Sequence, residues 1–126
     1  MCLLDCVVQY DTLNLTALAT SHQSNDNPLR VGNKIATING IEYAAQAMAI
    51  HASLIAEKTS NDDTVAMGYL ATVRNICIKT PYLPENSGPL SILVTQLMSD
   101  GHGFTYEFQL SCDQTIVISG KITIFL

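Results

Sequence analysis

The sequence is short of positive charge and of long apolar segments. It contains six lysine and arginine residues against eleven acidic ones, so the formal net charge is −5 at pH 7. Binding to nucleic acid needs a basic face, and this composition argues against it. No apolar run approaches the ~20 residues that span a bilayer, and the first residues lack the basic and apolar stretches of a signal peptide. We therefore expect a cytoplasmic protein without a membrane span.

The usual motifs of metal and nucleophile chemistry are also missing. No Gly-rich phosphate loop, zinc-ligand spacing or Ser-His-Asp arrangement is found. The cysteines form no C-x-x-C pair and lie mostly in apolar, strand-like runs, which favours buried free thiols over disulfides or metal ligands. We expect neither a metal nor a cofactor. The four cysteines are Cys2, Cys6, Cys77 and Cys112.

What the chain does contain is enough apolar material for one core. Of its 126 residues 48% are hydrophobic and 13% are charged, which predicts one globular domain over residues 1–126. The segment 38–57 is rich in alanine and reads as the one long helix, preceded by a polar loop at 21–34. Alternating apolar residues predict six strands, the third bent near Gly68. Their expected ranges are 3–8, 13–19, 64–79, 90–98, 104–111 and 115–125.

Two strands, one helix and four strands favour an α+β domain whose antiparallel sheet curls around the helix. At ~100° per residue, one stripe of the helix forms the expected core face. A narrower neighbouring stripe carries Glu42, Gln46, Ala49 and Ser53, whereas His51 lies on the opposite side and is expected at the surface or in a dimer contact. The core face comprises Ile41, Ala44, Ala45, Met48, Ala52 and Ile55.

Glu42 allows two readings from the residues alone. Asn39 and Glu42 have the spacing of a capping box, with Asn39 as N-cap and Glu42 at the third helical position. The same carboxyl group is also well placed for a site at the helix N-terminus, where free backbone N–H groups and the helix dipole stabilise developing negative charge. The two roles are compatible.

The run Gly-Ile-Glu-Tyr-Ala-Ala-Gln-Ala at 40–47 resembles the helix of hotdog-fold 3-hydroxyacyl-acyl carrier protein dehydratases. Their E-x-x-A-Q motif is matched by Glu42, Ala45 and Gln46. Residues 2–5 (Cys-Leu-Leu-Asp) and 68–70 (Gly-Tyr-Leu) resemble the ApeP-like branch, which is associated with aryl polyene and related fatty-acid-type synthesis. Relatives usually carry a further segment with a proline-histidine pair before the first strand. A cystatin-like α+β binding domain is the alternative fold.

The resemblance implies dehydration of a 3-hydroxyacyl thioester carried by acyl carrier protein or coenzyme A. Such a reaction needs a base at C2 and an acid at the C3 hydroxyl. Glu42 is the expected general acid, because desolvation by an apolar acyl chain would favour its protonated form. Gly40, Ile41, Tyr43 and Gln46 are the expected substrate contacts, and Gln46 could also orient Glu42 or a water.

The general base is not found where the resemblance places it. The dehydratases carry a histidine in an H-F-P-G-like loop, and that spacing falls on Pro28 within residues 27–30 (Asn-Pro-Leu-Arg). His22, an expected loop residue, and His102, in an expected turn, do not match the motif. Either His22 or another group substitutes, or a partner subunit supplies the base, or the site no longer dehydrates.

The same resemblance implies a homodimer with the substrate at the interface, and a higher oligomer or a pairing with another hotdog protein stays open. Arg30 and Lys34 are either solvated loop charges or contacts to the phosphate of a phosphopantetheine arm. Two further functions compete with dehydration. A hotdog thioesterase would use Glu42 to activate water, and a non-catalytic subunit would bind an acyl chain or pair with an active dehydratase.

Overall fold

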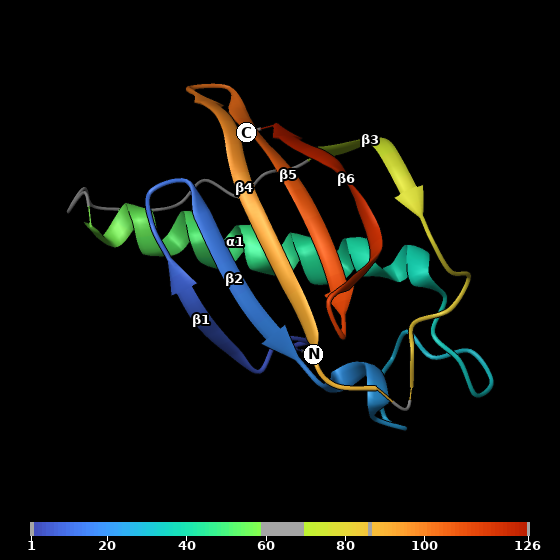
Figure 1. Cartoon of the computed structure of the whole chain (residues 1–126). Coiled ribbons are helices and arrows are strands. Elements are labelled where there is room, and N and C mark those ends of the chain that lie inside the picture. The colour runs from blue at the N-terminus through green and yellow to red at the C-terminus, as the bar shows by residue number, and fades with distance from the viewer. Residues whose placement is uncertain (1, 59–69, 86, 126) are drawn as a thin grey trace.

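The computed structural model describes residues 2–58, 70–85 and 87–125, and in these ranges one antiparallel sheet curves around one long helix (Figure 1). The helix α1 spans Gly40–Lys58 and runs across the strands on one face of the sheet. The sheet order is β1-β2-β4-β5-β6-β3, so β1 and β3 form its two edges. The strands are β1 Cys6–Tyr10, β2 Asn14–Ala19, β3 Leu70–Ile78, β4 Leu90–Asp100, β5 Gly103–Cys112 and β6 Thr115–Phe125.

The expected element order is confirmed, and the helix lies within two residues of its predicted bounds. The buried face of the helix differs from the predicted one. Ala44 and Met48 are buried as expected, but the stripe is rotated toward Tyr43, Ala47 and His51. The remaining predicted core residues of the helix are only half-buried; they are Ile41, Ala45, Ala52 and Ile55.

Hydrogen bonds explain why His51 is buried and not, as predicted, at the surface. Its Nε2 lies 2.9 Å from the Asp11 carbonyl oxygen, which can only accept, so Nε2 carries the proton. Nδ1, 2.7 Å from the Tyr106 hydroxyl, then accepts from that hydroxyl, which itself accepts from Gln96. Burial raises the pKa of Tyr106 to about 12. This chain of bonds ties the helix centre to β5 and the β1–β2 turn.

The last three strands, predicted at 90–98, 104–111 and 115–125, are joined by two hairpins. The Asp100 carboxylate accepts the backbone N–H groups of His102 and Gly103 at the β4–β5 turn, and His102 is exposed there as expected. Asp113 and Gln114 link β5 to β6 with φ angles of 51° and 68°. This left-handed pair matches the twist of a two-residue hairpin.

The edge strands depart most from the sequence-based prediction. β1 begins at Cys6, whereas Leu3 and Leu4 precede it and are buried. The register of β3 against β6 shifts near Asn75, which has a φ of 57°. The bend predicted at Gly68 lies outside the described residues.

All four cysteines are free, as predicted, but only Cys112 is buried. Cys6 and Cys77 are exposed because they lie on edge strands with one neighbour each, and Cys2 is exposed in the segment before β1. Among the described residues, no helix has the length and apolar character needed to cross a membrane.

Candidate functional site

The candidate site begins where α1 leaves a short 3-10 turn. The turn spans Thr37–Asn39, and the Gly40 N–H bonds to the Thr37 carbonyl oxygen. Asn39 therefore lies within the turn, and no described hydrogen bond joins its side chain or that of Glu42 to the helix start. The capping box is not formed. Glu42 lies in the first turn of α1 with an exposed side chain.

Gly40 is explained by close packing against the sheet. A Cβ at this position would lie 2.9 Å from Ile118 Cγ2 and 3.0 Å from Leu110 Cδ2. The helix start therefore rests directly on β5 and β6. Ile41 is half-buried and packs against the core. The expected substrate contacts of Gly40 and Ile41 stay predictions.

Tyr43 is fully buried in a polar network of defined direction. Ser21 Oγ lies 2.7 Å from the Leu3 carbonyl oxygen, which can only accept, so the single hydroxyl proton of Ser21 goes there. Tyr43 then donates to Ser21 over 2.9 Å and accepts from Asn27 Nδ2 over 3.1 Å. The Tyr43 hydroxyl is therefore committed to bonds within the fold.

Gln46 contacts the chain before β1. Its Oε1 accepts the Leu3 backbone N–H over 2.7 Å. Leu3 is thus held at both of its main-chain polar atoms, by Gln46 from the helix and by Ser21 from the 3-10 helix η1, Ser21–Gln23. The sequence indicated neither bond, because residues 3, 21 and 46 come together only through the fold.

The loop between β2 and α1 is organised around Arg30, which is not a solvated charge. Its side chain is 11% exposed and forms an ion pair with Glu85. The guanidinium also donates to the carbonyl oxygens of His22, Ser24 and Asn33. The hydrogen-bond donors of the Arg30 guanidinium are therefore used within the fold, by the loop carbonyl oxygens and by Glu85.

Lys34 lies 4.6 Å from the centre of the Tyr82 ring, in a cation–π contact.

His22 lies in the loop between β2 and α1, as the sequence predicted, but its side chain is buried. It belongs to η1 and is 1% exposed, and neither ring nitrogen has a hydrogen-bond partner. Burial lowers the pKa of its imidazole below 6.5, and the Arg30 guanidinium lowers it further. Asp5 and Glu85 act in the opposite direction, and Glu42 is not among the groups that influence it.

Neither His51 nor His102 is placed to serve Glu42 of the same chain. Both ring nitrogens of His51 are bonded within the core. His102 lies at the far end of β5 from Leu110, the residue beneath Gly40, and ~3.3 Å per residue separates them by roughly 26 Å. In the segment 27–30, where the H-F-P-G-like spacing falls on Pro28, the neighbouring Asn27 is buried and its amide bonds to the loop and Tyr43.

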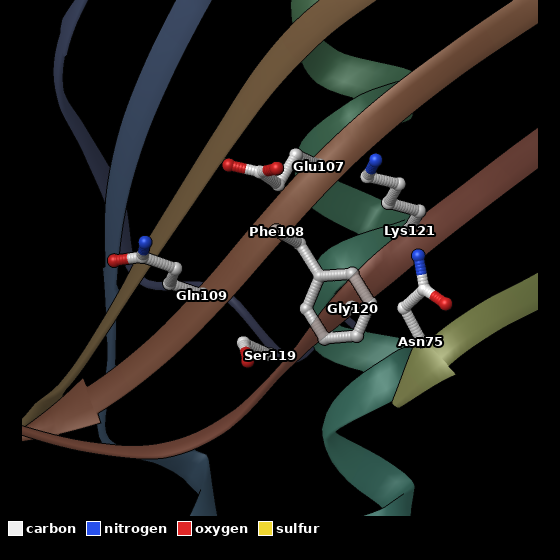
Figure 2. A pocket seen from close by; sticks show the side chains of 7 residues that line it. All are labelled: Asn75, Glu107, Phe108, Gln109, Ser119, Gly120 and Lys121. Carbon is white, nitrogen blue, oxygen red and sulfur yellow. The ribbon is translucent and has the colours of Figure 1, made fainter. Parts of the chain in front are cut away.

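Among the described residues, two hollows lie on the face of the sheet turned away from α1. One of them, of about 270 Å³, lies over β3, β5 and β6. It is lined mainly by polar side chains, and the Phe108 ring of β5 lies beside Gly120 of β6 (Figure 2). The other, of about 250 Å³, lies at the β1–β2 hairpin. Neither includes Glu42. Within the described part of the chain, no three His, Cys, Asp or Glu residues gather as a metal site.

The fold and the helix motif define the class of protein. The structure superposes on the dehydratase heterocomplex ApeI:P from Xenorhabdus doucetiae with a TM-score of 0.80 and 19% identity, covering 98% of this chain and 81% of that one. For a hypothetical thioesterase with coenzyme A from Streptococcus pneumoniae the TM-score is 0.62 and the identity 7%, and the match covers 95% of this chain and 83% of that one. For S. sahachiroi AziG the TM-score is 0.66 and the identity 11%, and the match covers 95% of this chain and 88% of that one. The fold is the hotdog fold, so the cystatin-like alternative is excluded.

A family model then gives the particular assignment. The ApeP-like model, described as ApeP dehydratase, matches residues 1–126. The chain belongs to the ApeP-like dehydratase family and is a hotdog dehydratase-like protein. The comparison with curated proteins gives no match.

Proposed function

We propose that this chain takes part in the dehydration of 3-hydroxyacyl thioesters, with Glu42 as general acid. The observation that carries the proposal is the placement of Glu42. The family match covers the whole chain, and Glu42 is exposed in the first turn of α1, within the helix motif that resembles the dehydratases. No described hydrogen bond or ion pair occupies its carboxyl group.

The reaction requires two proton transfers on one substrate. A base removes the C2 proton, and the C–H electron pair becomes the C2–C3 double bond. The C3–O bond breaks, and the hydroxyl leaves as water with the proton of Glu42. The positive end of the α1 dipole favours the negative charge that develops on the thioester oxygen.

The base comes from a second chain across the β3 edge. The start of α1 rests on Ile118 of β6, and Ile118 pairs with Ile78 of β3. Glu42 therefore lies about two strand spacings, or ~10 Å, from the open edge. A subunit whose β3 pairs there would bring its own side chains to the carboxyl group.

The second chain is a further copy or another hotdog protein. The ApeI:P structure that this chain resembles is a dehydratase heterocomplex, which supports the hetero-pair. We propose an acyl carrier protein thioester from fatty-acid or aryl-polyene-type synthesis as the substrate, with coenzyme A as the alternative carrier, and we place the reaction in the cytoplasm.

The test follows both proton transfers separately. The purified full chain is incubated with 3-hydroxybutyryl and crotonyl thioesters in D₂O, and interconversion and C2 deuterium exchange are measured. Glu42→Gln is expected to slow interconversion at least ~100-fold, while exchange at C2 continues because the base is intact. Ser53→Ala, an exposed change on the same helix face, is the control. Unchanged interconversion in Glu42→Gln would refute the assignment.

A hotdog thioesterase is the second candidate, because hydrolysis at Glu42 needs no loop histidine and the H-F-P-G-like segment 27–30 carries none. Release of free thiol from either substrate, lost in Glu42→Gln, would select it. A wild-type chain without either activity would support the non-catalytic acyl-binding or partner subunit.

A further inference from the structure

Two side chains bond to the Leu3 main chain, one to its N–H and one to its carbonyl oxygen. These bonds link the segment 2–4 to the helix. We call this segment the N-terminal strap. Gln46 accepts its N–H over 2.7 Å, and Ser21 donates to its carbonyl oxygen over 2.7 Å. The Leu3 side chain is buried as well. The strap is therefore fixed in position and not a loose chain end.

The two anchors of the strap lead back to the same helix turn. Ser21 accepts from Tyr43, and Tyr43 and Gln46 are three residues apart, which makes them neighbours on a helix surface. One anchor thus reaches α1 through Ser21 and the other directly. The strap is held against α1 between these two positions.

Glu42 lies next to this attachment. Gln46 follows Glu42 by four residues, a rise of ~6 Å on the same side of the helix. Helical side chains lean toward the N-terminus, so the Gln46 amide extends over the turn that begins at Glu42. The Leu3 main chain, bonded to that amide, accordingly borders the approach to the Glu42 carboxyl group.

We infer that Gln46 is a positioning residue: by holding Leu3 it fixes the N-terminal strap as one wall of the Glu42 site. This inference rests on the proposed function. The Gln46 side chain, expected from the sequence to contact substrate, is assigned instead to accepting the Leu3 N–H. That bond gives a reason for a glutamine at this position of the helix motif.

Acceptor and donor roles of Gln46 are separated by two substitutions. Gln46→Glu keeps an oxygen that accepts the Leu3 N–H but loses the amide donors, whereas Gln46→Ala loses both. Exchange of the Leu3 amide hydrogen, followed by NMR, is expected to rise about fivefold or more in Gln46→Ala and to stay slow in Gln46→Glu, given the net strength of one hydrogen bond. Ser53→Ala, two turns further on, should leave it unchanged.

Kinetics supply the second measurement. Gln46→Ala is expected to lower kcat about tenfold with KM changed less than twofold, and Gln46→Glu should recover most of the kcat. Ser21→Ala, which removes the other anchor, should reproduce the kcat loss of Gln46→Ala. Circular dichroism and Tm verify that each variant folds; if Ser21→Ala does not, Ser21→Thr, which keeps the hydroxyl, should retain the wild-type kcat.

The inference fails if Leu3 exchange is unchanged in Gln46→Ala, or if Gln46→Glu is as impaired as Gln46→Ala. The exchange measurement does not depend on turnover. A failure of this inference can therefore be distinguished from a failure of the proposed function. Loss of Leu3 protection in a chain without Glu42-dependent activity would overturn the positioning role, while dehydration with normal Leu3 exchange would leave the proposed function intact.

Discussion

At the scale of single residues, His22 is the most unusual group in the chain. A neutral imidazole has one N–H and one lone pair, and in this buried site neither has a partner. Protonation there would place a cation beside Arg30, with little solvent to stabilise it. The folded protein therefore binds a proton at His22 less readily than the unfolded chain does.

This difference predicts acid sensitivity. The folded pKa of His22 lies below the unfolded value of 6.5, so its effect on stability is absent above pH 6.5 and appears as the pH falls through that value. The free energy of unfolding should then decrease by up to about 1.4 kcal/mol per pH unit until the folded pKa is reached. Urea unfolding at pH 7.5 and 5.5 measures the slope.

His22→Gln should lose this part of the slope, whereas the exposed His102→Gln should keep it. A His22→Gln protein with the same pH dependence as the wild type would contradict the account.

At the scale of elements, the two glycines of the β4–β5 hairpin have different reasons to be glycine. A Cβ at Gly103 would lie 2.3 Å from the backbone oxygen of Ile124, whereas a Cβ at Gly101 would meet nothing within 4 Å. A backbone atom of a paired strand cannot move aside alone.

Gly103→Ala should therefore lower the free energy of unfolding by about 2–3 kcal/mol, because β5 and β6 must separate locally. Gly101→Ala in the same hairpin should change it by less than ~0.5 kcal/mol. Urea unfolding of both variants at pH 7.5 measures the two changes in free energy of unfolding. Equal changes would contradict the close contact between Gly103 of β5 and Ile124 of β6.

The elements also show what the sequence could and could not predict. The helix, both hairpins and the order of elements along the chain depend on local patterns, and all were predicted; the order of strands within the sheet was not. The buried face of α1 was not, because His51 and Tyr43 are buried through partners that come from distant parts of the chain. The same holds for His22 and Asn27. Cys6 and Cys77 were expected inside because strand-like runs do not reveal which strand will lie at an edge.

The candidate site divides in the same way. The short helix motif was enough to single out Glu42 and Gln46. The bond from Gln46 to Leu3 could not be predicted, because it joins residues far apart in sequence. The placement of both groups relative to a second chain likewise depends on an interface that no pattern within one chain encodes.

At the scale of the whole molecule, β3 is the edge that we assign to subunit pairing. Its Val73 is 38% exposed although it faces the helix side of the sheet. The two-fold symmetry of a dimer would bring a charge at this apolar position into the interface twice, which is unfavourable.

Val73→Lys should therefore weaken the dimer at least about tenfold. Analytical ultracentrifugation should show the wild type as a dimer and the variant shifted toward the 13.7 kDa monomer. Leu97→Lys, at a residue 50% exposed near the far end of β4, is the matched control and should remain dimeric. A monomeric wild type would count against a homodimer and leave the hetero-pair to be tested with a second hotdog protein.

The strand order has a consequence for how the protein is made. Among the described strands, β3 pairs only with β6. A ribosome must therefore add about 40 more residues, a few seconds of synthesis, before that neighbour exists. β1, β2, β4 and β5 all find a partner sooner. During this interval both sides of β3 are open, and a nascent chain on the same messenger could join it before its own sheet is complete. Assembly of the subunits during translation would then compete directly with the last step of folding.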